Sequence, residues 1–383
     1  MRIVHVSDCY WPRLGGIEMH LRDLVAHQRA AGHDARVLTV TPPGTAPDEF
    51  WVHRVDTTAG LARADAALRR LLREPVPDVV HVHVSMLSPF ATVAAHRAST
   101  SGHPTVVTVH SMWSRLGPLP AAARTVLGLR TWPVTWSAVS EPAAAPIRAV
   151  LGPAIPVRVL PNAVDPDLWR PGDQCLGRPA VPTVVSVMRL THTKRTLPLA
   201  RILHDVRRRL PDDQPLRAVV VGDGPQRATL HRYLRRHRMD DWVELPGTLD
   251  RSAVRERLGG GSVYVAPAEL ESFGIAALEA RTAGLPVVAS ARSGVREFVA
   301  HGVEGLLGET DAALVAHVVR LLTDDHLRTS IARHNATVPP RHDWTEACRL
   351  TEQLYLEAAA SRPRPRPVDR WSRPLAVAPG ASS

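Results

Sequence analysis

Lysine is almost absent from this chain. Lys194 is the only one, and arginine supplies all the other members of the 47 basic side chains. Asparagine occurs only at Asn162 and Asn335, and phenylalanine and tyrosine occur 4 times each. Scarce Lys, Asn, Phe and Tyr beside abundant Arg, Ala, Gly and Pro indicate a GC-rich coding bias. The formal net charge of +10 therefore does not predict a nucleic-acid partner, because the bias raises the arginine content throughout.

Cysteine and long apolar runs are also scarce. The 3 cysteines, Cys9, Cys175 and Cys348, are odd in number and far apart, which argues against a disulfide framework or a zinc site. No apolar run approaches the roughly 20 residues of a membrane-spanning helix. His5 and Asp8 interrupt the apolar run at the N-terminus, which favours a strand over a signal peptide. We therefore expect a protein of the reducing cytoplasm.

Short β-branched runs alternate with helix-compatible stretches along most of the 383 residues. Val-rich strands that alternate with helices predict parallel sheets covered on both faces. In the first half we expect a helix at Glu18–Ala31 and strands at Arg2–Ser7, Ala35–Val40, Val79–Val84, Thr105–His110, Thr135–Ser140 and Val157–Leu160. In the second half we expect strands at Thr183–Met188, Arg217–Val221, Trp242–Leu245, Ser262–Ala266 and Pro286–Ser290.

The composition divides the chain into two doubly wound halves. Residues 166–182 are rich in Pro, Gly and Asp, which is typical of a linker. We expect an α/β fold with Rossmann-like parallel-sheet domains at 1–165 and 183–345, which face a central crevice, and a helix at 346–360. Arg-Pro repeats in residues 361–383 indicate a disordered basic tail. A solvated tail is the preferred interpretation, and weak contact with an anionic membrane surface is the alternative.

A carboxylate motif follows one of the predicted strands. Its residues are Glu271, Ser272, Phe273, Gly274 and Ile275, and Glu279 follows in the same segment. Glu271 is expected at the carboxyl end of a strand, where open α/β sheets bind ligands. Gly274 permits close backbone approach, and free N–H groups at a helix start suit a phosphate or sugar oxygen. The two carboxylates are about two helical turns apart, so we expect them to face one crevice rather than to be solvated charges.

Two cations form a second group. Arg189 is expected at the end of a strand, and a short loop brings Lys194 to the start of a helix at Arg195–Arg207. Cations in these places can grip a diphosphate from both sides and stabilise negative charge on a departing nucleotide. The alternative for Lys194 is a solvated charge at a helix start.

Glycines mark two other strand ends. Gly15 and Gly16 lie between the first strand and the first helix, where glycine lets the backbone approach a phosphate. Alone, such a pair is as often a simple turn. Gly222 closes a strand with a tight turn, for which a structural role is the safer interpretation.

Histidines at two strand ends are further candidates. His110 ends a strand at the rim of the expected crevice, although any one of 19 histidines is more often structural. His81 and His83 alternate on one strand face with a spacing that suits a metal ion. The sequence indicates no third ligand beside them, so we prefer packing in the core or at the crevice. No metal site is predicted.

Taken in order, these motifs resemble those of the family-four retaining glycosyltransferases of the GT-B fold, over roughly residues 1–360. The resemblance implies that Glu271 contacts sugar hydroxyls of a nucleotide-sugar donor and that Glu279 binds the ribose. It also implies that Arg189 and Lys194 hold the diphosphate. The family usually has glycine after this lysine, whereas this chain has Arg195, which leaves the local turn open.

The resemblance implies transfer of a hexosyl or N-acetylhexosaminyl unit, with retention, from a UDP- or GDP-sugar to a hydroxyl. Acceptors of this kind are small polyols, secondary metabolites, lipids and glycans. The implied catalytic residues are His110, Arg189, Lys194 and Glu271. The implied donor contacts are Gly15, Gly16, Arg189, Lys194, Gly222, Glu271, Ser272, Phe273, Gly274, Ile275 and Glu279. No metal or other cofactor is expected, because cations and helix termini can carry the diphosphate charge. A nucleotide-sugar epimerase or a phosphorylase on the same two-domain fold is the alternative.

Overall fold

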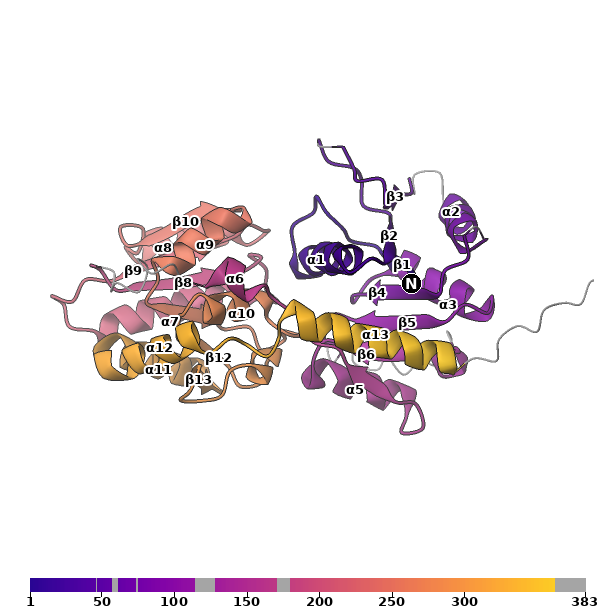
Figure 1. Cartoon of the computed structure of the whole chain (residues 1–383). Helices are drawn as coiled ribbons and strands as arrows, with labels where there is room; N and C mark the ends of the chain where they lie inside the picture. The colour runs from indigo at the N-terminus through magenta and orange to yellow at the C-terminus, as the bar shows by residue number, and fades with distance from the viewer. Residues whose placement is uncertain (46, 57–60, 74, 114–127, 171–179, 362–383) are drawn as a thin grey trace, which may run out of the picture.

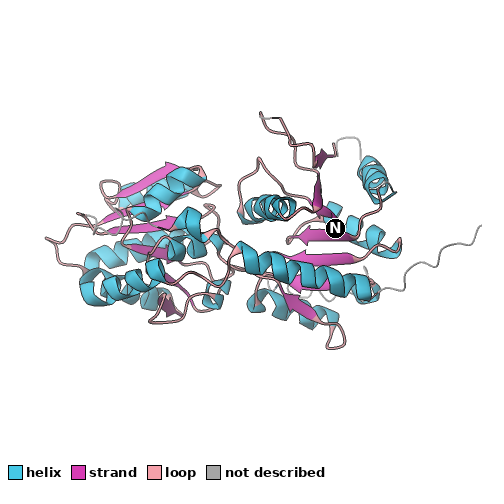
Figure 2. Cartoon of the chain, viewed as in Figure 1, coloured by secondary structure: helices cyan, strands magenta, loops and turns pink. Residues whose placement is uncertain are grey.

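The computed structural model describes residues 1–45, 47–56, 61–73, 75–113, 128–170 and 180–361 of the chain. They form two lobes, each built on a parallel sheet (Figure 1). Helices cover both faces of the sheets (Figure 2). The expected α/β class with two Rossmann-like domains is therefore confirmed.

The first sheet has 7 parallel strands in the order β3-β2-β1-β4-β5-β6-β7. These strands are β1 (Arg2–Ser7), β2 (Asp34–Thr39), β3 (Val52–Arg54), β4 (Val79–Val84), β5 (Thr105–Val109), β6 (Thr135–Ala138) and β7 (Val157–Val159). All but β3 were expected, with ends shifted by at most two residues. The sequence did not predict β3, because three residues are too few to show an alternating pattern.

Side chains on alternate positions of the first sheet enter different environments. Val80 and Val82 pack toward α3 (Pro89–Thr100), on the face that α2 (Leu61–Arg73) and α5 (Glu141–Leu151) also cover. Val79 packs on the opposite face with residues of α1 (Gly16–Ala30) and α13 (Trp344–Ala360). Because strand side chains alternate, His81 and His83 lie on this second face. The histidines therefore lie beneath α1 and α13.

The second sheet has 6 strands in the order β10-β9-β8-β11-β12-β13. They are β8 (Thr183–Val187), β9 (Arg217–Val221), β10 (Val243–Gly247), β11 (Val263–Ala266), β12 (Val287–Ser290) and β13 (Gly305–Gly308). The helices α7 (Thr196–Arg209), α8 (Arg227–Arg236), α11 (Asp311–Thr323) and α12 (Asp325–Thr337) contribute to one core. The helices α9 (Arg251–Gly259) and α10 (Ile275–Thr282) pack on the other face. The sequence did not predict β13, which begins and ends with glycine.

The connections between the lobes differ from a simple linker. A short helix, α6 (Pro166–Trp169), lies inside the expected linker, and Trp169 is buried. At the C-terminus, α13 begins at Trp344, two residues before the expected start, and returns to the first domain (Figure 1). There Leu354 and Tyr355 pack in a core with Ile3. The helix α13 therefore belongs structurally to the first domain.

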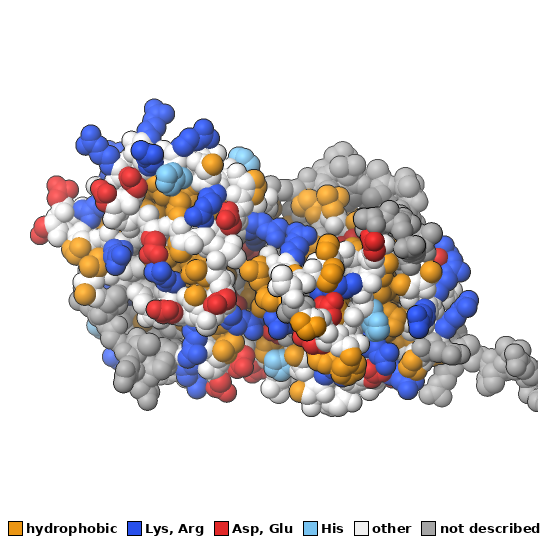
Figure 3. All heavy atoms as spheres, turned by 90° about the horizontal axis from the view of Figure 1, so that it is seen from above, with side chains coloured by type: hydrophobic (Ala, Val, Ile, Leu, Met, Phe, Trp, Pro, Cys, Tyr) orange, Lys and Arg blue, Asp and Glu red, His pale blue; other side chains and the backbone are white. Residues whose placement is uncertain are grey.

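Several expectations concern residues outside the described part of the chain. These are Cys175, much of the linker and, apart from Ser361, the basic tail at 361–383. Cys9 and Cys348 are free. Among the described residues, no helix has both the length and the apolar character needed to cross a membrane. Acidic and basic side chains are interspersed on the face shown in Figure 3, where they do not form the continuous basic stripe of a nucleic-acid interface.

Candidate active site

The carboxyl ends of strands from both sheets meet where the two domains touch. Arg189, just after β8, donates from Nη2 to the carbonyl oxygen of Leu14, which follows β1, at 3.2 Å. Ser272, after β11, donates from Oγ to the carbonyl oxygen of His110, after β5, at 2.7 Å. Ligands of open α/β sheets bind at such edges. The predicted site residues therefore gather at one interdomain edge.

Lys194 and Glu271 form an ion pair at this edge. The Lys194 Nζ lies 2.5 Å from Oε2 of Glu271, and their side chains are 30% and 19% exposed. The two residues come from the loops after β8 and β11, which are neighbouring strands. The sequence placed both residues near a donor but did not predict that they pair. The contact leaves a cation and a carboxylate side by side, a combination suited to the diphosphate and hydroxyls of one sugar nucleotide.

Arg195 resolves the turn that the sequence left open. It precedes α7 with φ 59° and ψ 44°, the left-handed region that favours glycine. Its guanidinium forms two hydrogen bonds with Asp311, of 2.8 and 3.0 Å, and donates to the carbonyl of Pro267 at 3.1 Å. These contacts offset the cost of the left-handed backbone. The loop that carries Lys194 is therefore tied to α11 by a side chain instead of being closed by glycine.

Gly222 holds the loop that carries Arg189. Its φ is +126°, and a Cβ there would lie only 1.9 Å from the carbonyl oxygen of Met188. The backbones after β8 and β9 therefore touch, which only glycine allows. This close contact is a structural reason for Gly222 and supports the safer of the two interpretations.

The motif after β11 is bound to the first domain through its backbone and side chain. Besides the Ser272 hydrogen bond to His110, the carbonyl of Ser272 accepts from Oγ of Ser140. Phe273 is buried and packs against Phe298, with ring centroids 5.2 Å apart. The side chain of Phe273 is thus a core anchor. Ser140 was not predicted as a site residue, although its position two residues after β6, at the same sheet edge, was a usable signal.

The two motif glutamates are not on one helix. Gly274, with φ +96°, precedes α10, which begins at Ile275, so Glu271 lies before the helix and Glu279 within it. The expected spacing of two helical turns was therefore wrong. Burial raises the pKa of the buried Tyr264 phenol, and the nearby Glu279 and Glu271 carboxyls raise it further. One tyrosine thus lies near both glutamates despite the corrected geometry.

Glu279 lines a pocket to which both domains contribute. Asp23 of α1, Arg251 of α9, Ile275 and Trp344 are among the other lining residues. Burial raises the pKa of Glu279 to about 8; Arg251 lowers it and Asp23 raises it, both to a smaller extent. Glu279 is therefore largely protonated at neutral pH without ligand. Such a carboxyl can donate or accept a hydrogen bond with a hydroxyl.

An interdomain ion pair beside Glu279 escaped the sequence analysis. Arg251 Nη2 lies 2.5 Å from Oδ2 of Asp23, and the pair links α9 to α1. Neither residue belongs to a recognisable motif. Asp23 lies between the buried Leu21 and Leu24 of α1, and nothing in its local pattern indicates a partner in the other domain.

The first helix approaches the motif loop at its N-terminus. Gly16 opens α1, and a Cβ on it would lie 3.6 Å from Cδ1 of Ile275. Gly15 has φ 178°, an extended conformation open to any residue. Glu18 in the first turn is buried and lies 3.1 Å from Nε of Arg13. The glycine pair thus brings α1 against α10, and the space beside Gly15 is taken by the Glu18 carboxylate.

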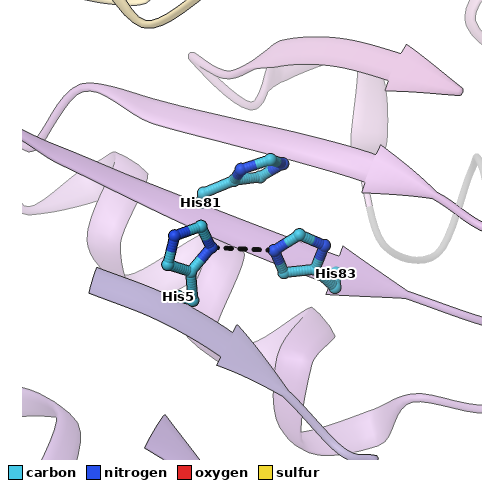
Figure 4. A group of neighbouring side chains, drawn as sticks. All are labelled: His5, His81 and His83. Atoms are coloured by element: carbon cyan, nitrogen blue, oxygen red, sulfur yellow. Dashed lines mark hydrogen bonds between the residues drawn. The ribbon is translucent and has the colours of Figure 1, made fainter. Parts of the chain in front are cut away.

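His81 and His83 have the third histidine that the sequence did not show. His5 of β1 pairs in register with His81, and ring nitrogens of all three residues lie within 4.8 Å of one another. Figure 4 shows the three rings, with His5 and His83 joined by a hydrogen bond. Strand register, which no single sequence reveals, creates this cluster. By composition, three imidazoles can ligate a transition metal.

Comparison with known proteins covers almost all of the described chain. Residues 14–168 match the profile described as Glycosyltransferase Family 4, and residues 178–337 match that of Glycosyl transferases group 1. A human relative, one of the subunits of phosphatidylinositol N-acetylglucosaminyltransferase, is 26% identical over 388 residues, which cover 96% of this chain and 79% of the human protein. The two profiles divide the chain as the two sheets do.

A bacterial relative and a solved structure agree with this match. The GDP-mannose-dependent alpha-(1-6)-phosphatidylinositol monomannoside mannosyltransferase of Mycobacterium tuberculosis is 29% identical, over 94% of this chain and 99% of that protein. Anabaena HepE, solved in complex with UDP and glucose, superposes with a TM-score of 0.77 at 18% identity. That superposition covers 93% of this chain and 100% of HepE, and it shows a shared fold.

Proposed function

We propose that this chain, which belongs to the family-four type glycosyltransferases and has the GT-B fold, uses a nucleotide diphosphosugar as donor. It transfers a hexosyl or N-acetylhexosaminyl unit to an acceptor hydroxyl with retention at the anomeric carbon. The observation that carries this proposal is the Lys194–Glu271 pair at the edge where Ser272 reaches His110. A cation and a carboxylate are held there against the opposing domain.

In this proposal the second domain binds the donor. Arg189 and Lys194 bind the diphosphate, Glu271 orients the sugar hydroxyls and Glu279 binds the ribose. The cations stabilise the charge that develops on the diphosphate as the bond to the sugar breaks. When the diphosphate arrives, Lys194 shares its charge between the phosphate and Glu271, and Arg189 leaves the carbonyl of Leu14.

The transfer follows a front-face course. The bond between the anomeric carbon and the β-phosphate oxygen breaks, and the acceptor oxygen bonds to the same face of the sugar. The acceptor proton passes to the departing phosphate oxygen, so that nucleoside diphosphate is released. Retaining glycosidases use two closely spaced carboxylates that flank the scissile bond, whereas Glu271 here is already paired with a cation.

The relatives narrow the choice of substrate. The human and mycobacterial relatives are both named for phosphatidylinositol substrates, and the mycobacterial protein is named as GDP-mannose-dependent. HepE was solved with UDP and glucose. These names support a UDP- or GDP-sugar as the donor. Among the polyol, secondary-metabolite, lipid and glycan acceptors considered, they favour a polyol or a lipid-linked polyol.

A donor screen tests this proposal first. Thermal unfolding is measured with UDP-, GDP- and TDP-sugars, because a ligand stabilises by RT ln(1 + [L]/Kd). We expect a rise in melting temperature with one base. NMR of the product should show the anomeric configuration of the donor, and inversion would overturn the proposed mechanism. Full activity in the presence of a chelator is expected, since this proposal assigns the diphosphate to Arg189 and Lys194.

The alternatives predict different products. An epimerase releases a changed nucleotide sugar without an acceptor, whereas transfer releases nucleotide only when an acceptor is added. A glycogen-phosphorylase-like enzyme would carry pyridoxal phosphate, which absorbs visibly. Formation of a changed nucleotide sugar without an acceptor would favour the epimerase over the proposed transferase. Absorbance by bound pyridoxal phosphate would favour the phosphorylase.

For the basic tail at 361–383 of a cytoplasmic enzyme, a solvated tail is the preferred interpretation and weak membrane contact is the alternative to be tested. The tail carries Arg362, Arg364, Arg366, Arg370 and Arg373, and cations near an anionic surface contribute about 1 kcal/mol each. Deletion of 362–383 should leave turnover of a soluble acceptor unchanged. If the full chain sediments with phosphatidylserine vesicles and the shortened chain does not, membrane contact by the tail is supported. If deletion leaves sedimentation unchanged, the tail makes no such contact.

A further inference from the structure

A chain of hydrogen bonds connects His110 to the buried histidines. Nε2 of His110 lies 3.0 Å from Nδ1 of His83. Nε2 of His83 lies 3.0 Å from Nδ1 of His5, the contact drawn in Figure 4. Nε2 of His5 lies 2.7 Å from Oε1 of Gln28 on α1. Each link uses the two nitrogens of an imidazole in the same order.

Gln28 joins this series to a second branch that reaches α13. The amide nitrogen of Gln28 donates to the hydroxyl of Tyr355 at 3.1 Å. That hydroxyl lies 2.8 Å from Nδ1 of His81, and Nε2 of His81 lies 2.6 Å from Oγ1 of Thr108. The network therefore runs without a break from the interdomain edge to the last helix.

The far end of the branch favours one direction for the bonds of the network. Ser137 Oγ lies 2.7 Å from Oγ1 of Thr108 and donates to the carbonyl oxygen of Val107 at 3.4 Å. A carbonyl oxygen only accepts. Ser137 therefore accepts from Thr108, Thr108 accepts from the Nε2–H of His81, and Nδ1 of His81 accepts from Tyr355.

The same direction passes through Gln28 to the first branch. Because the Tyr355 hydroxyl donates its hydrogen bond to His81, it accepts one from the amide nitrogen of Gln28. The amide oxygen of Gln28 then faces His5. A neutral imidazole has one N–H and one acceptor nitrogen. His5 donates from Nε2, so its Nδ1 accepts from His83, and Nδ1 of His83 accepts from the Nε2–H of His110.

The imidazoles are neutral at pH 7, as this argument requires. Burial lowers the pKa of His5 and of His110 to about 4. Burial also lowers the pKa of His81 and His83 well below the ordinary value, and the neighbouring imidazoles lower it further. Each ring therefore carries a single proton whose place is set by the bond at the other nitrogen.

The hydrogen bonds also account for the cluster that has the composition of a metal site. Both ring nitrogens of His5, His81 and His83 have partners: Gln28 and His83, Tyr355 and Thr108, and His5 and His110. A metal ion would have to displace several of these bonds. The observations favour a hydrogen-bond relay over a metal site.

We propose that Gln28, His5 and His83 are positioning residues that hold His110 as the tautomer protonated on Nε2, with Nδ1 ready to accept from a sugar hydroxyl. Within the described part of the chain, Nδ1 of His110 has no hydrogen-bond partner, while its backbone carbonyl is held by Ser272. The catalytic half of this inference rests on the proposed function; the tautomer does not.

The test uses the full-length protein labelled with 15N-histidine. Nitrogen chemical shifts identify the protonated ring nitrogen, and the signal of His110 is assigned as the one lost in His110→Asn. We expect protonated Nε2 in the wild type. His83→Leu should shift the population toward protonated Nδ1, whereas His83→Gln should preserve the wild-type tautomer, since an amide can donate to His5 and accept from His110.

Further variants guard against a folding defect and against an indirect effect. Tyr355→Phe keeps the shape of the side chain but frees the Gln28 amide to turn, so it should shift the His110 tautomer partly. Tyr264→Phe, a buried tyrosine of the second domain, should leave the tautomer unchanged. In turnover assays, His83→Leu should lower kcat about 10-fold with little change in donor KM, and His83→Gln should restore most of it.

Three results would overturn the proposal. These are a wild-type His110 protonated on Nδ1, an unchanged tautomer in a folded His83→Leu variant, and stoichiometric zinc binding that shifts the signals of His5, His81 and His83. The spectra need no substrate, so they decide the relay even if the protein transfers no sugar. A wild-type protein without transferase activity but with the expected tautomer would refute only the proposed function.

Discussion

The two sheets share a strand order but treat polar side chains in opposite ways. Except for the extra β7, both follow the same order from edge to edge. The first sheet buries His5, His81 and His83, whose ring nitrogens all have hydrogen-bond partners. The second sheet keeps its reactive charges, Lys194 and Glu271, in loops at the rim. Neutral groups can be buried when every donor has a partner, whereas charges remain where water or a ligand reaches them.

The largest effect is expected at the charged rim. Lys194→Ala should lower kcat and weaken donor binding, with a combined penalty of roughly 2–4 kcal/mol, because the diphosphate gains charge as the sugar bond breaks. Lys194→Arg should remain impaired if the site fits only an ammonium. Steady-state kinetics with the donor varied measures both. Full activity in Lys194→Ala would contradict the diphosphate role and would mean that Lys194 is only a surface charge.

A double variant separates two causes of that loss. Lys194→Ala also leaves Glu271, which is 19% exposed, without its cation. If the orphaned carboxylate is responsible, Lys194→Ala with Glu271→Gln should recover activity. We expect no recovery, since Glu271 is proposed to orient the sugar.

Glu279 differs from Lys194 and Glu271 because burial raises its pKa, and the pH dependence of stability can test this. Its folded-state pKa of about 8 lies above the ordinary value of 4.5. The folded state therefore binds an extra proton, and the resulting stability is present at low pH and lost as pH rises from 4.5 to 8. Relative to wild type, Glu279→Gln should gain roughly 2–3 kcal/mol in unfolding free energy between pH 5 and 7.

Urea denaturation of the ligand-free protein at several pH values measures this gain. A difference between Glu279→Gln and wild type that stays constant with pH would mean that Glu279 is ionised.

A matched pair of tyrosines compares the two interiors directly. Tyr355 joins Gln28 and His81, whereas Tyr264 makes a single hydrogen bond, to the carbonyl of Val187 at 3.1 Å. Tyr355→Phe should cost about 2 kcal/mol, because it leaves two buried polar groups unpaired, and Tyr264→Phe about 1 kcal/mol. Thermal unfolding of both variants gives the ranking. Equal losses would show that the first interior is no more tightly coupled than the second.

Arg195 provides the last comparison, in which the glycine variant should show the smallest net loss of stability. Arg195→Ala keeps the left-handed backbone and loses the contacts with Asp311, so it should destabilise the protein by about 1–2 kcal/mol. Arg195→Gly loses the same contacts but removes the backbone strain, and it should lie about 1 kcal/mol above the alanine variant. Urea denaturation measures the difference. An alanine variant as stable as the glycine variant would show that the backbone carries no strain.

The sequence predicted best what depends on local pattern. Val-rich strands gave both sheets, and the isolated Lys194 indicated the site that contains Glu271. The short strand β3 and the glycine-bounded β13 lack such a pattern. The turn at Arg195 was left open for another reason, since side-chain contacts with α11 override the usual preference for glycine in a left-handed conformation.

Features that depend on long-range register could not be predicted. His5 joins His81 only because β1 and β4 pair in parallel, and Tyr355 reaches His81 from a helix 274 positions further along the chain. The predicted helical spacing of Glu271 and Glu279 was wrong for a related reason. The helix α10 begins only at Ile275, after the left-handed Gly274, so Glu271 lies in the loop before it. In each case, tertiary contacts decide the geometry.

The return of α13 to the first sheet has a consequence for biosynthesis. Leu354, Tyr355 and Ala358 complete a core whose other members include Ile3 and Val106. Until α13 has been translated, one face of the first domain lacks its covering helix. Gln28 and His81 then lack their hydrogen-bond partner Tyr355. A stop codon before α13 therefore damages the beginning of the protein rather than its end. A helix translated after the second domain thus completes the core of the domain translated before it.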